Sequence, residues 1–190
     1  MTWDERYRKD ECADLQPMTF LRTLADRMPS EALVLDLACG AGRHALLFAE
    51  RGCRVLAVDS SAVAIDSIRS RSRVDTFVCA AEDFEMTEGA FDLVIVTMFL
   101  DRGLFPKIRA AVKRGGRVAM AIPLVDEREG VKAMNPAYLL KPGELAAEFP
   151  DPQWMHEHLV ETRPDAPSRG IAELIAKKQK GRNPQARPLL

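Results

Sequence analysis

The stretch that decides the fold reads VLDLACGAGRHALLFAERG and spans residues 34–52. The short apolar run at residues 32–38 precedes two glycines, Gly40 and Gly42, a pattern typical of a buried parallel strand and a tight turn. Residues 43–51 predict a helix, which Gly52 ends. Glycines at such a turn let the backbone approach a ligand, and the helix start presents N–H groups to it.

The same alternation of apolar strands and helices continues along the chain. We expect further strands at 54–58, 74–79, 91–97 and 116–122, and helices at 17–28, 60–71, 104–113 and 143–149. Two last strands, at 154–162 and 170–177, are separated by too few residues for a crossover helix and must be antiparallel. The fold class is therefore α/β: a doubly wound, mostly parallel seven-stranded sheet with an antiparallel last strand.

Length and charge limit the organisation of the chain and its partners. At roughly 100 to 200 residues per domain, 190 residues predict one domain, which we place at 1–178. Within it we expect an N-terminal helical cap at 1–30 and a lid loop at 124–141, followed by a basic flexible tail at 179–190. The net charge of −1 gives no basic field that would attract nucleic acid or an anionic membrane, so we expect neither as a partner.

The first residues, MTWDERYRKDECADL, are too charged for a secretory signal, and the chain lacks an apolar run of membrane-span length. The cysteines are scattered without metal-ligand spacing, and no zinc set can be assembled from the histidines. These features predict a cytoplasmic protein with free thiols and no metal site.

Two carboxylates indicate the ligand. Asp59 ends the second strand, where a carboxylate can accept hydrogen bonds from a ribose diol, which dinucleotides and S-adenosylmethionine share. Asp36 would repel a pyrophosphate but suits a cofactor that carries an ammonium and a sulfonium. The pair therefore favours S-adenosyl-L-methionine over a nicotinamide cofactor, although Asp36 could instead close the turn and Asp59 could cap a helix.

With these motifs the chain resembles the class I S-adenosylmethionine-dependent methyltransferases, whose first two motifs match VLDLACGAGRHALLFAERG and VLAVDSS. The chain is similar to the small bacterial branch of tellurite-resistance methyltransferases in three segments, GRHA, WDERY and NPAYLLKPGEL. The resemblance implies an enzyme that transfers a methyl group to a small molecule. The cofactor-binding residues we expect are Asp36, Ala38, Gly40, Gly42, Asp59, Ser60, Ala81, Glu82 and Thr97.

The chain departs from that family pattern at three positions. Ala80 stands where the family commonly has an acid for the adenine, and Glu82, Asp83 or the Ala81 amide could substitute. Phe99 replaces an aromatic alcohol and Asp101 replaces a histidine. These departures keep open a noncatalytic cofactor-binding protein as an alternative, and an NAD(P)-binding reductase is a further one.

Two more expectations concern the mouth of the site. Because the ligand crevice lies beyond the carboxyl ends of parallel strands, Arg169 at the start of the antiparallel last strand can face it. Arg169 is our catalytic candidate, and an ion pair with Glu161 is the competing interpretation. Trp3 and Tyr7 are four residues apart and so share one helical face, and we expect their segment to close over the cofactor.

Overall fold

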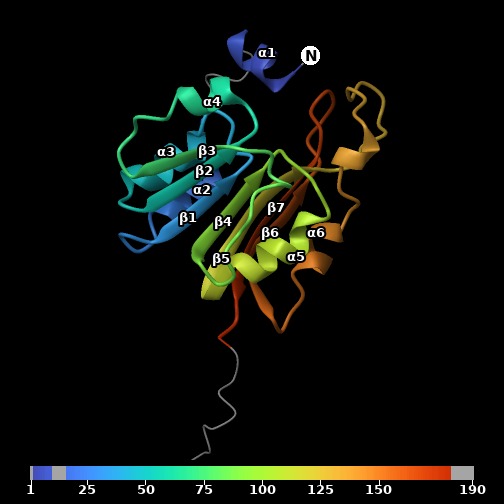
Figure 1. Cartoon of the computed structure of the whole chain (residues 1–190). Coiled ribbons are helices and arrows are strands. Elements are labelled where there is room, and N and C mark those ends of the chain that lie inside the picture. Colours follow the sequence, from blue (N-terminus) through green and yellow to red (C-terminus); the bar gives the residue numbers. More distant parts are fainter. Residues whose placement is uncertain (1, 10–15, 181–190) are drawn as a thin grey trace, which may run out of the picture.

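A seven-stranded sheet forms the centre of the molecule in the computed structural model, which describes residues 2–9 and 16–180 (Figure 1). The strands follow the order β3-β2-β1-β4-β5-β7-β6. Their bounds are β1 Leu33–Leu37, β2 Arg54–Asp59, β3 Val74–Val78, β4 Phe91–Thr97, β5 Val112–Pro123, β6 Trp154–Thr162 and β7 Ile171–Lys178.

The first five strands are parallel, and the last two are antiparallel to their neighbours. β7 pairs with β5 antiparallel, and β6 pairs with β7 antiparallel across the short connection at 163–170. The predicted seven-stranded sheet with its antiparallel end is therefore confirmed. Because strand order reverses at β1 and β4, the carboxyl ends of these two strands form the switch point where doubly wound sheets bind ligands.

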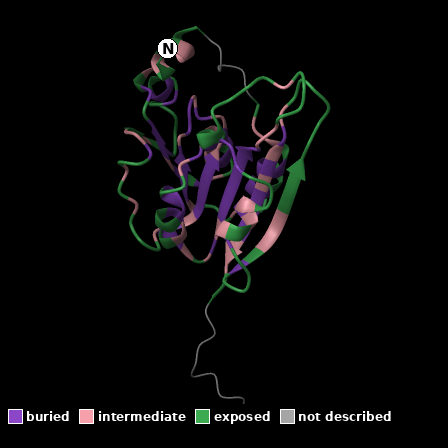
Figure 2. Ribbon diagram, turned by 90° about the vertical axis from the view of Figure 1, so that its right-hand side faces the viewer, coloured by how far each residue is buried: buried purple, intermediate pink, exposed green. Residues whose placement is uncertain are grey.

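Helices cover both faces of the sheet, and successive residues of β1 enter opposite cores. Leu35 and Leu37 pack in the core beneath α5 (Leu104–Ala111) and α6 (Glu144–Glu148), and Val34 packs in the other core. That second core lies beneath α2 (Thr19–Ala25), α3 (Arg43–Glu50) and α4 (Ala62–Asp66). Figure 2 shows that the central strands are buried. No helix among the described residues is long and apolar enough to cross a membrane.

Four elements differ from the expectation. α4 is much shorter than the predicted 60–71 helix, because the residues after Asp66 are rich in serine and arginine and Ser67 bonds its hydroxyl to the Ala64 carbonyl. α5 ends at Ala111, and β5 begins directly at Val112 rather than after Gly115. The N-terminal helix of the 17–28 segment covers only Thr19–Ala25.

Two further helical pieces frame the upper end of the sheet. α1 (Trp3–Arg8) is closed by a capping box between Thr2 and Glu5. The segment 124–141 contains the 3-10 turn η1 (Pro136–Tyr138), and its base is joined by a bridge between Leu124 and Leu140. The predicted tail lies outside the described residues from 181 onward.

Asp36 fixes the junction of β1 and α3. Its place in β1 puts it on the same face as Val34, below α3, where its Oδ2 accepts a hydrogen bond of 2.9 Å from the Ala45 amide. Asp36 is 1% exposed, and this burial raises the pKa of its carboxyl from 3.8 to about 7.

We predict that Asp36 makes stability depend on pH. Since its carboxyl titrates near 3.8 when unfolded and near 7 when folded, its contribution is full below pH 3.8 and is lost as the pH rises through about 7. Asp36→Asn keeps an oxygen for the Ala45 amide and cannot titrate. Between about pH 5 and pH 8 the unfolding free energy of the wild type should therefore fall more than that of the variant, by on the order of 1 kcal/mol per pKa unit. Chemical denaturation at both pH values measures this, and parallel profiles would contradict it.

Candidate functional site

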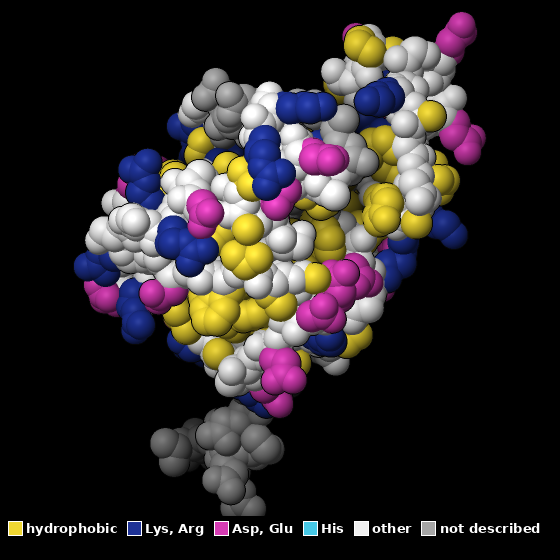
Figure 3. Space-filling model, turned by 45° about the horizontal axis from the view of Figure 1, so that its top comes forward, with side chains coloured by type: hydrophobic (Ala, Val, Ile, Leu, Met, Phe, Trp, Pro, Cys, Tyr) yellow, Lys and Arg dark blue, Asp and Glu magenta, His cyan; other side chains and the backbone are white. Residues whose placement is uncertain are grey.

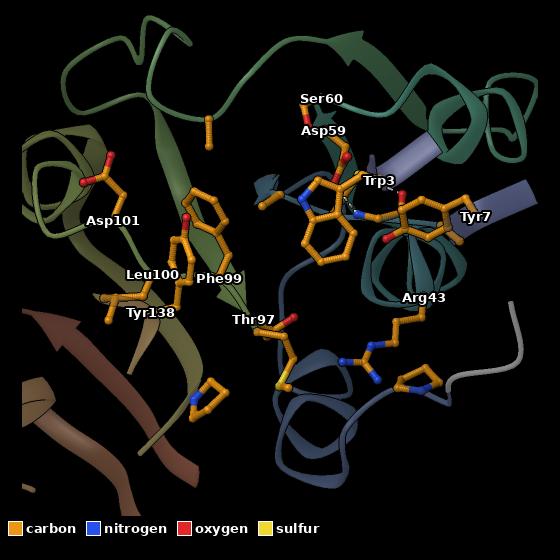
Figure 4. Close-up of a pocket in the computed structure, with 18 of the residues that line it drawn as sticks. Trp3, Tyr7, Arg43, Asp59, Ser60, Thr97, Phe99, Leu100, Asp101 and Tyr138 are labelled. Atoms are coloured by element: carbon orange, nitrogen blue, oxygen red, sulfur yellow. Dashed lines mark hydrogen bonds between the residues drawn. The ribbon is translucent and has the colours of Figure 1, made fainter. Parts of the chain in front are cut away.

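A cavity of about 1450 Å³ opens at the carboxyl ends of β1, β2 and β4 (Figure 4). Most of the predicted cofactor residues line it, namely Ala38, Gly40, Asp59, Ser60, Ala81, Glu82 and Thr97. The structure therefore brings together residues from four separate strand ends, as the topology predicts.

Asp59 connects the first two loops of the site. Its Oδ2 accepts a hydrogen bond of 2.8 Å from the Gly40 amide, and its Oδ1 accepts one of 2.8 Å from the Ser61 amide. A carboxylate has about four lone-pair sites, so each oxygen can accept a further bond from a ligand. Asp59 thus shapes the loop after β1 and still presents acceptors to the cavity, which it lines.

Two residues with left-handed backbone lie side by side at the switch point. Ala38 follows β1 with φ of 56°, and Met98 follows β4 with φ of 58°. A non-glycine residue in this region costs on the order of 1 kcal/mol and is most often found at functional sites. Both residues line the cavity, so the strain lies where a ligand would contact the backbone.

Asp36 and Gly42 do not line the cavity but lie behind the loop. Asp36 faces the Ala45 amide, as described above. A Cβ on Gly42, whose φ is 72°, would lie 2.6 Å from Ile68 Cδ1 in the core. The expectation that Gly42 makes room for a ligand therefore needs correction: its missing side chain makes room for Ile68.

Gly40 contacts the N-terminal helix through Tyr7. A Cβ on Gly40 would collide with the Tyr7 hydroxyl, so the Tyr7 side chain holds this position only because residue 40 has no side chain. The Ser61 hydroxyl donates a hydrogen bond of 2.5 Å to Asp4 and ties α1 to the start of α4. This bond holds the pKa of the Asp4 carboxyl below its usual value.

Aromatic side chains of α1 extend over the cavity, as Figure 4 shows. Trp3 and Tyr7 both line it, with ring centroids 6.4 Å apart. The Arg6 guanidinium lies 4.6 Å from the centre of the Trp3 ring. The predicted shared helical face therefore exists, and it faces the site.

His44 connects three elements beneath the cavity. Its Nε2 accepts a hydrogen bond of 3.4 Å from the Met18 amide, and its Nδ1 lies 3.3 Å from Thr97 Oγ1. Burial lowers the pKa of His44 to about 3, so the ring is neutral. Since Nε2 accepts, Nδ1 carries the proton and donates it to Thr97, which fixes the side chain at the end of β4.

The other end of the cavity is mostly apolar, with Asp101 and Arg102 as its charged side chains, and it is built from two segments that are far apart in the sequence. The loop after β4 contributes Phe99, Leu100 and Asp101, and the 124–141 segment contributes Met134 and Tyr138. In Figure 4 Phe99, Leu100 and Tyr138 lie together on the side of the cavity opposite Arg43.

Arg102 holds these two segments together. Its Nε and Nη2 donate to the two carboxylate oxygens of Glu144 at 2.6 and 3.0 Å. Its Nη1 and Nη2 also donate to the carbonyls of Ala137 and Leu139, which flank Tyr138, at 3.1 and 3.0 Å. Bidentate pairs of this kind are geometrically specific, so Tyr138 is positioned by the loop of β4.

Arg169, the catalytic candidate, does not line the cavity. Its guanidinium donates to the carbonyls of Leu124, Asp126 and Lys132 and so holds the first half of the 124–141 segment. Its bonds therefore differ from both interpretations in the sequence analysis, a substrate contact and an ion pair with Glu161. Arginine after a turn gives no sequence signal that distinguishes carbonyl contacts from ligand contacts.

Sequence reasoning missed several residues of the site. Arg43 at the start of α3 lines the cavity, as do Arg102 and Tyr138. Tyr138 lies within NPAYLLKPGEL, so an exposed aromatic residue in a polar loop was an available signal. Among residues 2–9 and 16–180, no group of His, Cys, Asp and Glu could hold a metal ion.

Comparisons with known proteins agree with this geometry. Residues 34–117 match the family described as methyltransferase domain. No curated protein matches the sequence at a significant level.

Several solved structures share the fold. TehB from Haemophilus influenzae superposes with a TM-score of 0.73 at 19% identity, over 93% of this chain and 67% of that one. The 1,6-didemethyltoxoflavin-N1-methyltransferase of Burkholderia thailandensis, solved with its substrate and S-adenosylhomocysteine, gives 0.68 at 20% identity, over 92% and 84%. Geranyl diphosphate C-methyltransferase of Streptomyces coelicolor gives 0.66 at 19% identity, over 84% and 75%. The matched domain at residues 34–117 and the shared fold agree with the resemblance to class I S-adenosylmethionine-dependent methyltransferases that the motifs indicate.

Proposed function

We propose that the protein transfers a methyl group from S-adenosyl-L-methionine to a small-molecule acceptor. The observation that carries the proposal is the Asp59 carboxylate at the end of β2, which lines a cavity that continues to an apolar wall beyond β4. Solved proteins with this fold act on small molecules such as 1,6-didemethyltoxoflavin and geranyl diphosphate.

The size of the cavity and the polar groups that line it fit the cofactor. Pockets for one drug-sized ligand are typically about 300 to 1000 Å³, so about 1450 Å³ leaves room for a nucleoside cofactor and an acceptor together. Asp59 has acceptor capacity for the ribose hydroxyls, and Ala81 and Glu82 lie where the next strand ends. The cofactor end thus extends over β1, β2 and β3, and the acceptor end over β4.

The bound cofactor would supply the methyl carbon. The acceptor's lone pair would form the new bond to this carbon while the electrons of the broken carbon–sulfur bond return to sulfur, and the acceptor's proton would pass to water. The chain's own task is alignment and exclusion of water, because the sulfonium is already activated. Thr97, fixed by neutral His44, and the strained Met98 hold the edge between the two ends of the cavity. Trp3 and Tyr7 shield it from above. No strong general base is required for this chemistry.

The expected site residues that do not line the cavity, Asp36, Gly42 and Arg169, support the residues that do line it. Asp36 positions the start of α3 through the Ala45 amide, and Gly42 lets Ile68 pack beneath the loop. Arg169 shapes the 124–141 segment and is not retained as a catalytic residue.

One prediction of the proposed function concerns Asp59. Loss of a charge-assisted hydrogen bond costs about 1.5 to 3 kcal/mol, so Asp59→Ala should weaken binding of S-adenosylhomocysteine by roughly ten- to a hundredfold. Isothermal titration calorimetry measures the dissociation constant. Asp75→Ala, which removes an exposed carboxylate from neighbouring β3, is the matched control and should leave it unchanged.

Because Asp59 also accepts bonds from Gly40 and Ser61, thermal melts of Asp59→Asn separate binding from folding. A folded Asp59 variant with wild-type affinity would overturn the proposal. Tight binding of NADH in place of S-adenosylhomocysteine would favour the reductase. Cofactor binding with no S-adenosylhomocysteine release across many acceptors would favour the noncatalytic protein.

A further prediction concerns α1 as a cover over the cofactor. Amides of residues 3–8 should exchange more slowly with solvent when S-adenosylhomocysteine is added, because a cover contributes mainly to the closed complex. Tyr7→Ala should weaken binding about tenfold, the cost of losing part of an aromatic contact. Lys9→Ala at the exposed end of α1 is the control. Equal exchange with and without ligand would contradict the cover.

A further inference from the structure

Four exposed hydrophobic side chains line the cavity: Trp3 lies above its cofactor end, and Met98, Met134 and Tyr138 lie at its acceptor end, where they point to an apolar ligand. Trp3, Met98, Met134 and Tyr138 are 51%, 50%, 44% and 58% exposed, and all four line the cavity. Figure 3 shows hydrophobic side chains on the upper surface of the molecule. Exposed apolar side chains that converge on a cavity indicate a ligand that covers them.

The composition of this end favours a ring. Phe99 and Tyr138 supply aromatic surfaces, which pack well against other aromatic groups. Met98 and Met134 supply thioethers, which also contact aromatic rings favourably and adapt to their shape. Because Arg102 fixes the carbonyls on both sides of Tyr138, this wall is formed before any ligand binds.

Charge at the acceptor end is negative where a ligand can reach it. Asp101 lines the cavity, and its Oδ1 accepts a hydrogen bond of 2.8 Å from the Gly103 amide, which holds the carboxylate in place. Oδ2 has no hydrogen-bond partner among the described residues. Among the described residues, Arg102 is the one cationic side chain at the acceptor end, and its ion pair with Glu144 neutralises its charge.

The remaining arginines that line the cavity come from the opposite side. Arg6 belongs to α1, Arg22 to α2, and Arg43 and Arg51 to α3. An anionic acceptor beyond β4 would therefore face Asp101 rather than an unpaired cation. An acceptor that donates a hydrogen bond or carries positive charge would be complementary.

We infer that the acceptor is a flat aromatic small molecule with an amino or ring N–H group, neutral or cationic, and not an inorganic oxyanion. The ring packs against Phe99, Met134 and Tyr138, and the N–H group donates to Asp101 Oδ2. The inference rests on the proposed function and names the substrate class of the same site.

A pair of ring-matched probes tests the inference in the protein saturated with S-adenosylhomocysteine. 4-Aminoquinoline and quinoline-4-carboxylate share the ring and differ in the sign of their charge, and tellurite and selenite represent oxyanions. Calorimetry should show the amine binding at least about tenfold more tightly than the carboxylate. Oxyanions should not bind.

Variants of Phe99, Tyr138 and Asp101 test whether the amine binds at the acceptor end of the cavity. Phe99→Ala and Tyr138→Ala should each weaken the amine about tenfold, and Asp101→Asn should remove most of the preference for the amine over the carboxylate. The affinity for S-adenosylhomocysteine should stay within about twofold. Met155→Ala is the control. It removes a methionine of β6 that is about as exposed as Met134 but does not line the cavity, and it should leave the affinity for the amine unchanged.

The outcomes separate the two proposals. If S-adenosylhomocysteine does not bind, the proposed function fails and this inference fails with it. If it binds but the amine does not, or tellurite or the carboxylate binds more tightly, the substrate class is wrong while the methyltransferase proposal stands. Wild-type amine affinity in folded Phe99→Ala and Tyr138→Ala proteins would also overturn the inference.

Discussion

The hydrogen bond from the Gly40 amide to the Asp59 carboxylate is the contact on which the site depends. It joins the loop after β1 to the end of β2, and the second oxygen of the same carboxylate fixes Ser61. Ser61 in turn bonds Asp4, so the position of α1 follows from the position of Asp59. The buried Asp59 carboxylate therefore fixes the loop at the base of the cavity and, through the Ser61 hydroxyl, the position of α1 above it.

The two carboxylates of the predicted cofactor motif have separate roles because of which side of the backbone each occupies. Asp36 lies within β1 and alternation directs it into the core below α3, where burial raises the pKa of its carboxyl. Asp59 is the last residue of β2 and therefore reaches the cavity. Position within a strand, rather than residue type, separates the carboxylate that orders the loop from the one that meets a ligand.

Local sequence patterns predicted the sheet well, and they named residues that the structure brings together at one cavity. The strands at 91–97 and 154–162 coincide with β4 and β6, since apolar alternation and nearby turn residues fix both ends. The loop residues Ala38, Gly40 and Asp59 line the cavity because every parallel strand delivers its carboxyl end to the same edge. α4 was overestimated because serine hydroxyls compete with helix formation in a way that apolar periodicity does not reveal.

The acceptor end could not be derived in the same way, because its contacts join segments distant in the chain. Arg102 contacts the carbonyls beside Tyr138, and Arg169 contacts the carbonyls of 124, 126 and 132. A carbonyl offers an arginine the same bond whatever the residue, so the sequence carries no complementary signal for either contact.

The two arginines hold different parts of the 124–141 segment. Arg102 holds the half that carries Tyr138, and Arg169 holds the half that begins after β5. Together they make the segment a wall built by backbone contacts. The side chains on that wall, such as Met134 and Tyr138, can then vary without disturbing its position, so the acceptor end can change its chemistry while the cofactor end keeps the constraints of Gly40 and Asp59.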